Sequence, residues 1–108
     1  MFKFIGRFLW LLTYFTFGCD INPRSKITGT LILPHPLGIV IGEGVILENQ
    51  NIIYQNVTLG INRGEYPILN NCIVYSSAVV CGGVRLENIK ISALSLILDT
   101  NDLNKRTA

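Results

Sequence analysis

Apolar residues return along this chain at intervals of six positions, a period that fits neither an amphipathic helix nor an alternating strand. The long aliphatic series is Ile21, Ile27, Leu33, Ile41, Leu47, Ile53, Leu59, Ile68, Val74, Val80, Leu86, Ile91 and Ile97. A second apolar or small residue follows most of them four positions later: Ser25, Leu31, Val45, Val57, Cys72, Ala78, Val84 and Ser95, with Asn51 as the polar exception. Six-residue repeats are typical of a parallel β-helix, in which each unit is one short strand and a turn. We therefore predict an all-β chain wound into stacked coils, with both series pointing inward.

The repeat slips in three places, and these irregular units are the expected location of chemistry. The unit that opens at Leu33 runs eight residues, and the interval after Leu59 is nine, so residues 62–67 are expected to leave the coil as a loop. One residue is missing between Leu86 and Ile91. Insertions in a solenoid are expelled onto its outside, commonly on the binding face. At three units per coil, the repeats predict about four coils and a body about 20 Å tall.

The first eighteen residues are different in kind, because they are apolar and aromatic with Lys3 and Arg7 near their start. We predict an N-terminal helix over residues 1–18, a β-helix domain over 19–98 and a polar tail over 99–108. The helix is expected either to cover the open edge of the first coil or of a neighbouring subunit, or to lie in a membrane surface through residues 1–17. A secreted chain is disfavoured because no small-x-small cleavage site follows. An apolar stretch of about ten residues is too short to span a bilayer.

Composition narrows the class of protein. At 108 residues the chain is one domain, and a net charge of +2 with 15% charged residues argues against a nucleic-acid partner. Three cysteines without metal-ligand spacing disfavour a disulfide framework and favour a reducing cytoplasm. One histidine and scattered carboxylates form no coordination cluster, so no metal is expected.

The only histidine, His35, lies between Pro34 and Pro36 in the first irregular unit. Proline fixes backbone φ and restricts its neighbour, so the imidazole is expected on a stiff, bulged segment. Asp20 precedes His35 by fifteen residues, slightly less than one coil of eighteen, so the two side chains are expected on adjacent rungs. A carboxylate on one imidazole nitrogen fixes the tautomer and leaves the other free to take a proton. This pair suits removal of a proton from a substrate hydroxyl.

Three blocks of this sequence resemble the serine acetyltransferase family, and more specifically its branch among polysaccharide-biosynthesis enzymes. They are residues 19–29 (Cys-Asp-Ile-Asn-Pro-Arg-Ser-Lys-Ile-Thr-Gly), 34–43 (Pro-His-Pro-Leu-Gly-Ile-Val-Ile-Gly-Glu) and 53–60 (Ile-Tyr-Gln-Asn-Val-Thr-Leu-Gly). The resemblance runs from about Gly18 to Leu98. It implies a left-handed parallel β-helix, a homotrimer with active sites between subunits, and acetyl-CoA as donor.

The resemblance also implies roles for individual residues. His35 matches the family's general base, and Asp20 matches the aspartate that orients it. Ser76, Ala78 and Ala93 match positions whose backbone lines the CoA groove.

Two departures from the family bear on the acceptor. Pro34 stands where serine-specific members carry an aspartate that contacts the ammonium group, and Glu65-Tyr66-Pro67 replaces their Arg-His-Pro. An arginine binds a carboxylate bidentately, whereas Glu65 would repel one. We therefore expect a sugar hydroxyl as acceptor, with Tyr66 and Glu65 as its contacts and Tyr66 stacking on the sugar ring.

The sequence thus predicts a cytoplasmic O-acetyltransferase, acting in surface-polysaccharide biosynthesis and placed in the cytoplasm or at the inner face of the membrane. Three alternatives stay open. The first is a serine O-acetyltransferase of cysteine biosynthesis. The second is a non-catalytic scaffold or decayed enzyme, favoured by the missing second histidine and the slip after Leu86. The third is another acyl or nucleotidyl transfer on the same scaffold, since fold alone does not decide among activities.

Overall fold

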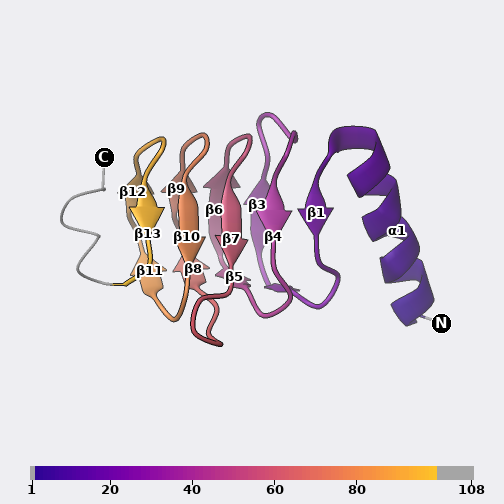
Figure 1. Ribbon diagram of the computed structural model, residues 1–108, viewed down its shortest axis with the longest axis horizontal. Helices are drawn as coiled ribbons and strands as arrows, with labels where there is room; N and C mark the ends of the chain where they lie inside the picture. Colours follow the sequence, from indigo (N-terminus) through magenta and orange to yellow (C-terminus); the bar gives the residue numbers. More distant parts are fainter. Residues whose placement is uncertain (1, 100–108) are drawn as a thin grey trace.

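The computed structural model describes residues 2–99, including their side chains outside residues 2, 3 and 13–17, and has extents of 43 × 26 × 24 Å. A helix, α1 (Phe2–Phe17), stands at one end of a stack of coils (Figure 1). Within the described residues the stack contains thirteen strands: β1 (Asp20–Ile21), β2 (Lys26–Ile27), β3 (Thr30–Ile32), β4 (Val40–Ile41), β5 (Ile46–Glu48), β6 (Gln50–Ile53), β7 (Thr58–Gly60), β8 (Ile68–Asn70), β9 (Ile73–Val74), β10 (Val79–Cys81), β11 (Arg85–Glu87), β12 (Lys90–Ile91) and β13 (Leu96–Ile97).

The strands form three parallel sheets, because each strand pairs with the strand three further along the chain. The first sheet has the order β1-β4-β7-β10-β13, the second β2-β5-β8-β11 and the third β3-β6-β9-β12. Each coil therefore gives one strand to each face of a triangular prism. This confirms the predicted β-helix of about four coils, and its architecture is that of the left-handed type.

The core is the interior of the prism, where residues of successive coils stack in register. In the first sheet Ile41 pairs with Leu59 and Leu59 with Val80, and all three are at most 1% exposed. Most of the second, compact series is buried as predicted: Val45, Val57, Cys72, Ala78, Val84 and Ser95. Asn51 is also buried, and its amide donates to the Glu48 carbonyl oxygen while its Oδ1 accepts from the Cys72 backbone N–H. The polar exception is therefore hydrogen-bonded, as a buried amide must be.

One assignment of the repeat is wrong. Ile68 is half-buried and pairs with Ile46, whereas Leu69 is fully buried and pairs with Leu47 and Leu86. The interval after Leu59 is thus ten residues, not nine. Both residues are aliphatic, so the sequence did not distinguish them. The register with the neighbouring coils decides, because a slip of one position turns every side chain to the opposite face.

Two edges of the prism matter for function. The turns that lead from the third sheet to the first form the upper edge in Figure 1, which we call the His35 corner (residues 33–39, 54–57, 75–78 and 92–95). The turns that lead from the first sheet to the second form the lower edge, which we call the Tyr66 corner (residues 22–25, 42–45, 61–67 and 82–84). The predicted loop at residues 62–67 projects from the Tyr66 corner.

The helix α1 packs against β1 at the first coil. Gly6 faces Pro23, close enough that an added Cβ would lie 3.3 Å from the Pro23 Cβ. The opposite side of α1 exposes Phe4, Ile5, Phe8, Leu9, Leu11 and Leu12. Ile27 of the first coil stays 38% exposed, so α1 covers this end only in part. Among the described residues, no helix is both long and apolar enough to cross a membrane.

The tail predicted over residues 99–108 lies outside the described residues beyond Asp99.

Replacing Leu59, which is fully buried, tests the inward series. Leu59→Ala is expected to lower the free energy of unfolding by about 2–5 kcal/mol, because it leaves a cavity between two coils. The control Ile61→Ala, at a side chain 55% exposed, is expected to change it by less than about 0.5 kcal/mol. Denaturant unfolding measures both, and equal losses would contradict the assignment.

Candidate functional site

His35 is exposed on the bulge that joins β3 to β4 at the His35 corner. Its carbonyl oxygen accepts from the Leu37 N–H at 2.8 Å, and Gly38 has a φ of 64°. A Cβ at Gly38 would meet Oδ1 of Asn56 in the next coil, and the positive φ of Gly38 is itself a conformation that favours glycine. The bulge is thus seated on the coil beside it and holds the imidazole outside the prism.

Asp20 is the first residue of β1, which pairs with β4 through Asp20 and Val40. Its N–H donates to the Ile39 carbonyl oxygen at 2.7 Å, directly after the His35 bulge. Because the preceding residue Cys19 is buried, the alternation of the strand directs Asp20 outward. The structure therefore holds the Asp20 and His35 segments in adjacent coils on one side of the prism, as their spacing predicts.

The two side chains are not hydrogen-bonded to each other. Among the described residues the Asp20 carboxylate has one side-chain partner, the indole N–H of Trp10 in α1, which donates to Oδ1. This contact could not be predicted from the repeat, because Trp10 belongs to a helix outside it.

Two tyrosines extend the His35 corner along the stack. The rings of His35 and Tyr54 are tilted by 42° with centroids 6.4 Å apart, and Tyr54 stacks on Tyr75 at 5.2 Å. Neither tyrosine was predicted as a site residue, although each directly follows an inward residue, Ile53 or Val74. That shared position in the repeat predicts rings one above the other, and here they form a column beside the histidine.

The residues matched to the CoA groove lie further along the same corner. Ser76 is half-buried, and its carbonyl oxygen accepts from the Leu94 N–H at 3.0 Å, while Ala93 is exposed on the last coil. Ala78 is fully buried, and its carbonyl oxygen is used by the Thr58 N–H. Ser76 and Ala93 thus offer surface in line with His35, whereas the Ala78 side chain belongs to the core.

Tyr66 and Glu65 lie at the other edge. The Tyr66 ring covers Gly42 and Gly44 and packs partly against the core; an added Cβ would collide with the ring at Gly44 and lie 3.0 Å from it at Gly42. Glu65 lies against Gly83 and lines a pocket of about 460 Å³ at the Tyr66 corner. In Figure 1 the Tyr66 loop leaves the lower edge while the His35 bulge is at the upper edge. One chain alone therefore does not bring these two predicted contacts to His35.

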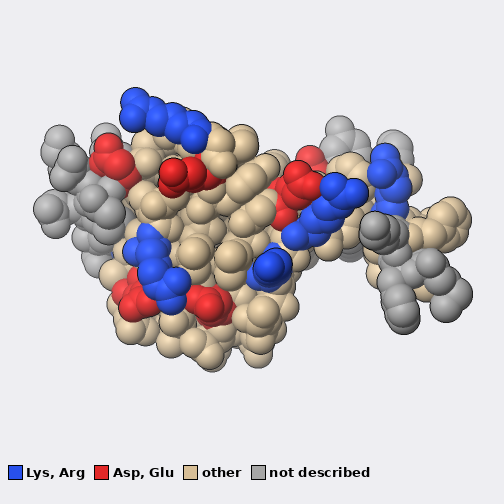
Figure 2. Space-filling model, turned by 90° about the horizontal axis from the view of Figure 1, so that it is seen from below, with Lys and Arg blue, Asp and Glu red and all other residues tan. Residues whose placement is uncertain are grey.

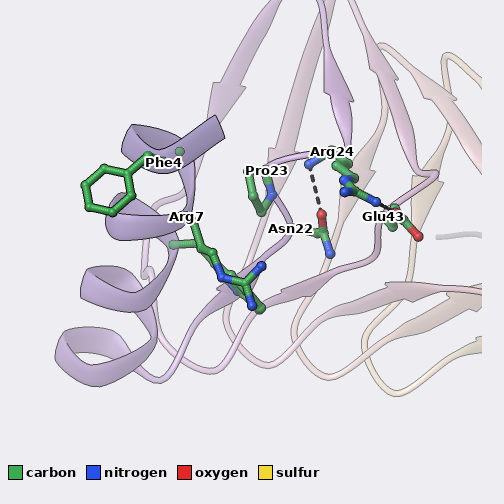
Figure 3. A pocket seen from close by; sticks show the side chains of 8 residues that line it. Phe4, Arg7, Asn22, Pro23, Arg24 and Glu43 are labelled. Atoms are coloured by element: carbon green, nitrogen blue, oxygen red, sulfur yellow. Dashed lines mark hydrogen bonds and ion pairs between the residues drawn. The ribbon is translucent and has the colours of Figure 1, made fainter. Parts of the chain in front are cut away.

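A larger cleft, of about 650 Å³, opens between α1 and the first coil (Figure 3). It is lined by Phe4, Gly6, Arg7, Trp10, Asn22, Pro23, Arg24 and Glu43. Neither His35 nor Asp20 lines this cleft, so its size does not make it the catalytic centre.

Charges on the β-helix are mixed in sign. Arg24 pairs with Glu43 at 2.8 Å, and Arg85 contacts Glu48 at 3.3 Å and Glu87 at 2.8 Å. On the face seen in Figure 2, basic and acidic side chains lie next to one another. The hydrogen bond to Glu87 and the charge of Glu48 raise the pKa of Arg85. Across residues 2–99, no group of three or more His, Cys, Asp or Glu side chains is placed to hold a metal ion.

The three cysteines are unpaired, and Cys19 and Cys72 are buried. Desolvation by burial raises the pKa of the Cys72 thiol and of the half-buried Cys81 thiol. Since the thiolate is the nucleophilic form, neither of these thiols is suited to carry an acyl group.

No family model matches the chain. It is 36% identical over 89 residues to a serine acetyltransferase of Buchnera aphidicola subsp. Schizaphis graminum, covering 76% of this chain and 34% of that relative. It is 35% identical over 103 residues to a serine acetyltransferase of Helicobacter pylori, covering 90% and 60%. The chain thus spans between about a third and three fifths of the length of these relatives.

Solved structures of serine acetyltransferases also resemble this chain. A serine acetyltransferase in complex with CoA matches with a TM-score of 0.81 at 30% identity, over 90% of this chain and 42% of that one. A serine acetyltransferase of Neisseria gonorrhoeae matches with a TM-score of 0.78 at 32% identity, over 87% and 40%. The similarity includes the β-helix that carries His35 and Asp20.

Proposed function

This chain belongs to the hexapeptide-repeat acyltransferase family, because its sequence is 35–36% identical to serine acetyltransferases over most of its length, and we propose that it is an acetyl-CoA-dependent O-acetyltransferase. The observation that carries the proposal is the placement of Asp20 and His35 in adjacent coils on one side of the prism. A related structure holds CoA, and Ser76 and Ala93 offer surface along the same corner as His35.

The proposed reaction is a direct transfer without an acyl-enzyme. Nε2 or Nδ1 of His35 takes the proton of the acceptor hydroxyl while the hydroxyl oxygen attacks the thioester carbonyl carbon. Backbone N–H groups near the site stabilise the oxyanion that forms. The carbon–sulfur bond then breaks, and the CoA sulfur leaves with the proton carried by the imidazolium. Asp20 holds the ring in the tautomer that this cycle requires.

The acceptor is where the sequence and the comparisons differ. The sequence favours a saccharide, whereas the relatives and solved structures described above are serine acetyltransferases and give no support to the polysaccharide branch. We therefore propose serine as the first acceptor to test. A saccharide hydroxyl is the second candidate, because Pro34 and Glu65 stand where a serine site needs an aspartate and an arginine.

Turnover of acetyl-CoA, followed by the release of free thiol, tests the mechanism with serine and with a panel of sugars. His35→Ala is expected to lower turnover by about 10²- to 10⁴-fold, because the acceptor proton loses its base. Lys90→Ala, an exposed residue of the third sheet, is the matched control and is expected to keep the original rate.

Unchanged turnover in His35→Ala would remove the proposed mechanism. A folded protein that neither turns over acetyl-CoA nor binds CoA at millimolar concentration would support the non-catalytic scaffold instead.

We also propose a homotrimer with sites between subunits. The support is geometric: the His35 and Tyr66 corners lie at opposite edges of the first sheet, so a site that contains both needs a second copy of the chain. In a closed ring of identical subunits, the His35 corner of one copy can face the Tyr66 corner of the next.

Coexpression of two inactive variants tests this arrangement. Neither His35→Ala nor Tyr66→Ala trimers are expected to turn over, but mixed trimers are expected to recover about a quarter of the original activity, because one interface in four combines both intact residues. No recovery, or a monomeric mass in light scattering, would contradict shared sites.

For its location, we propose the cytoplasm, with α1 resting on the inner face of the membrane. The exposed apolar side of α1 supports this, together with Lys3 and Arg7 and the lack of any acidic residue before Asp20. A short helix of this kind suits the interface of an anionic bilayer.

Flotation with vesicles that contain anionic lipid tests the membrane contact. The protein is expected to float with these vesicles, and Phe4→Ser/Phe8→Ser is expected to abolish flotation because it removes apolar area. Ile61→Ser is the control, since it removes an exposed apolar side chain elsewhere. If the double variant instead alters the oligomeric mass, the apolar side of α1 contacts another subunit.

A further inference from the structure

Among the described side chains of α1, that of Trp10 contacts the candidate catalytic pair. The indole N–H of Trp10 donates to Oδ1 of Asp20, and both residues are half-buried. An indole is a donor only, so this bond requires Asp20 as acceptor. Trp10 is the only tryptophan of the chain.

The surroundings of Trp10 hold its ring in place. Gly6, one turn earlier in α1, lets the helix approach Pro23 of the first coil. The Arg7 guanidinium lies over the Trp10 ring, 5.7 Å from its centroid, in a cation–π arrangement. Figure 3 shows the Phe4 ring pointing away from the first coil, although Phe4 is among the residues that line the cleft. The contact of Trp10 with Asp20 is therefore a polar one at the place where α1 meets β1.

The position of this contact matters because Asp20 has two carboxylate oxygens and a choice of rotamers. Without a partner, an outward aspartate at the start of an edge strand samples several of them, and fixing one costs conformational entropy. Trp10 engages Oδ1 before any substrate is bound and leaves Oδ2 for an imidazole N–H.

We propose that Trp10 is a positioning residue, which holds the Asp20 carboxylate in the orientation that His35 needs. The consequence is that catalysis depends on the seating of α1 on the first coil, although α1 contributes no group to the reaction. This inference rests on the proposed roles of Asp20 and His35. The Trp10–Asp20 contact is an observation that does not depend on those roles.

The contact is tested first, without any activity measurement. The fluorescence of the single tryptophan is expected to change in Asp20→Asn, because the indole loses its charged acceptor. It is expected to stay unchanged in Glu43→Gln, which removes the carboxylate that lines the neighbouring cleft. An unchanged spectrum in Asp20→Asn would overturn the proposal.

Steady-state kinetics then test the positioning role. Trp10→Phe keeps an aromatic ring and removes the N–H, and is expected to lower kcat about threefold to tenfold with an unchanged KM for acetyl-CoA. In the Asp20→Asn background the same change is expected to have no further effect, because the carboxylate to be held is already absent. Circular dichroism checks that each variant folds.

Two outcomes would overturn the positioning role and leave Trp10 a packing residue. One is that Trp10→Phe lowers kcat as much in the Asp20→Asn background as in the wild-type protein. The other is that Trp10→Phe raises KM and leaves kcat unchanged. If the wild-type protein is inactive with every acceptor, the proposed function fails and the positioning role fails with it. The fluorescence result would still decide whether the contact exists.

Discussion

The stacking of inward side chains between successive coils is the constraint on which this structure depends. Ile41, Leu59 and Val80 touch the residues above and below them, and no coil closes a core by itself. Parallel pairing in register then fixes which residues of each unit face outward. The candidate functional residues lie at the corners, where a turn can lengthen without moving a strand.

The corners differ in what they carry. At the His35 corner an eight-residue unit bulges out, and the glycine contact with Asn56 seats the bulge on the next coil. At the Tyr66 corner a longer insertion folds back over Gly42 and Gly44. Insertions at these places leave the stack intact, since they lengthen a turn without moving a strand. As a consequence, the His35 and Tyr66 loops lie apart within one chain. A site that contains both loops therefore needs two copies of the chain.

The N-terminal end of the stack has a different character from the interior. The first coil has a neighbour on one side only, and its Ile27 remains partly exposed. The helix α1 covers part of this end with Gly6 and Trp10, whereas the described side chains of Phe4, Phe8 and Leu9 are exposed. Among the described side chains, those of Phe4, Phe8 and Leu9 leave apolar surface on α1 for another surface to cover. Trp10 links α1 to Asp20.

By itself, the sequence determined the coiled fold, the approximate number of coils and the spacing that puts Asp20 beside the His35 bulge. The physical reason is that a six-residue unit buries its apolar residues by stacking on the units of the neighbouring coils. It did not determine whether Ile68 or Leu69 enters the core, since both are aliphatic and only the pairing with Leu47 and Leu86 separates them. The repeat could have predicted the Tyr54–Tyr75 stack, because the two tyrosines occupy the same position of the six-residue unit. The separation of Tyr66 from His35 and the bond from Trp10 to Asp20 were decided by the tertiary structure, because they depend on which edge of the prism a turn occupies and on how a helix outside the repeat docks.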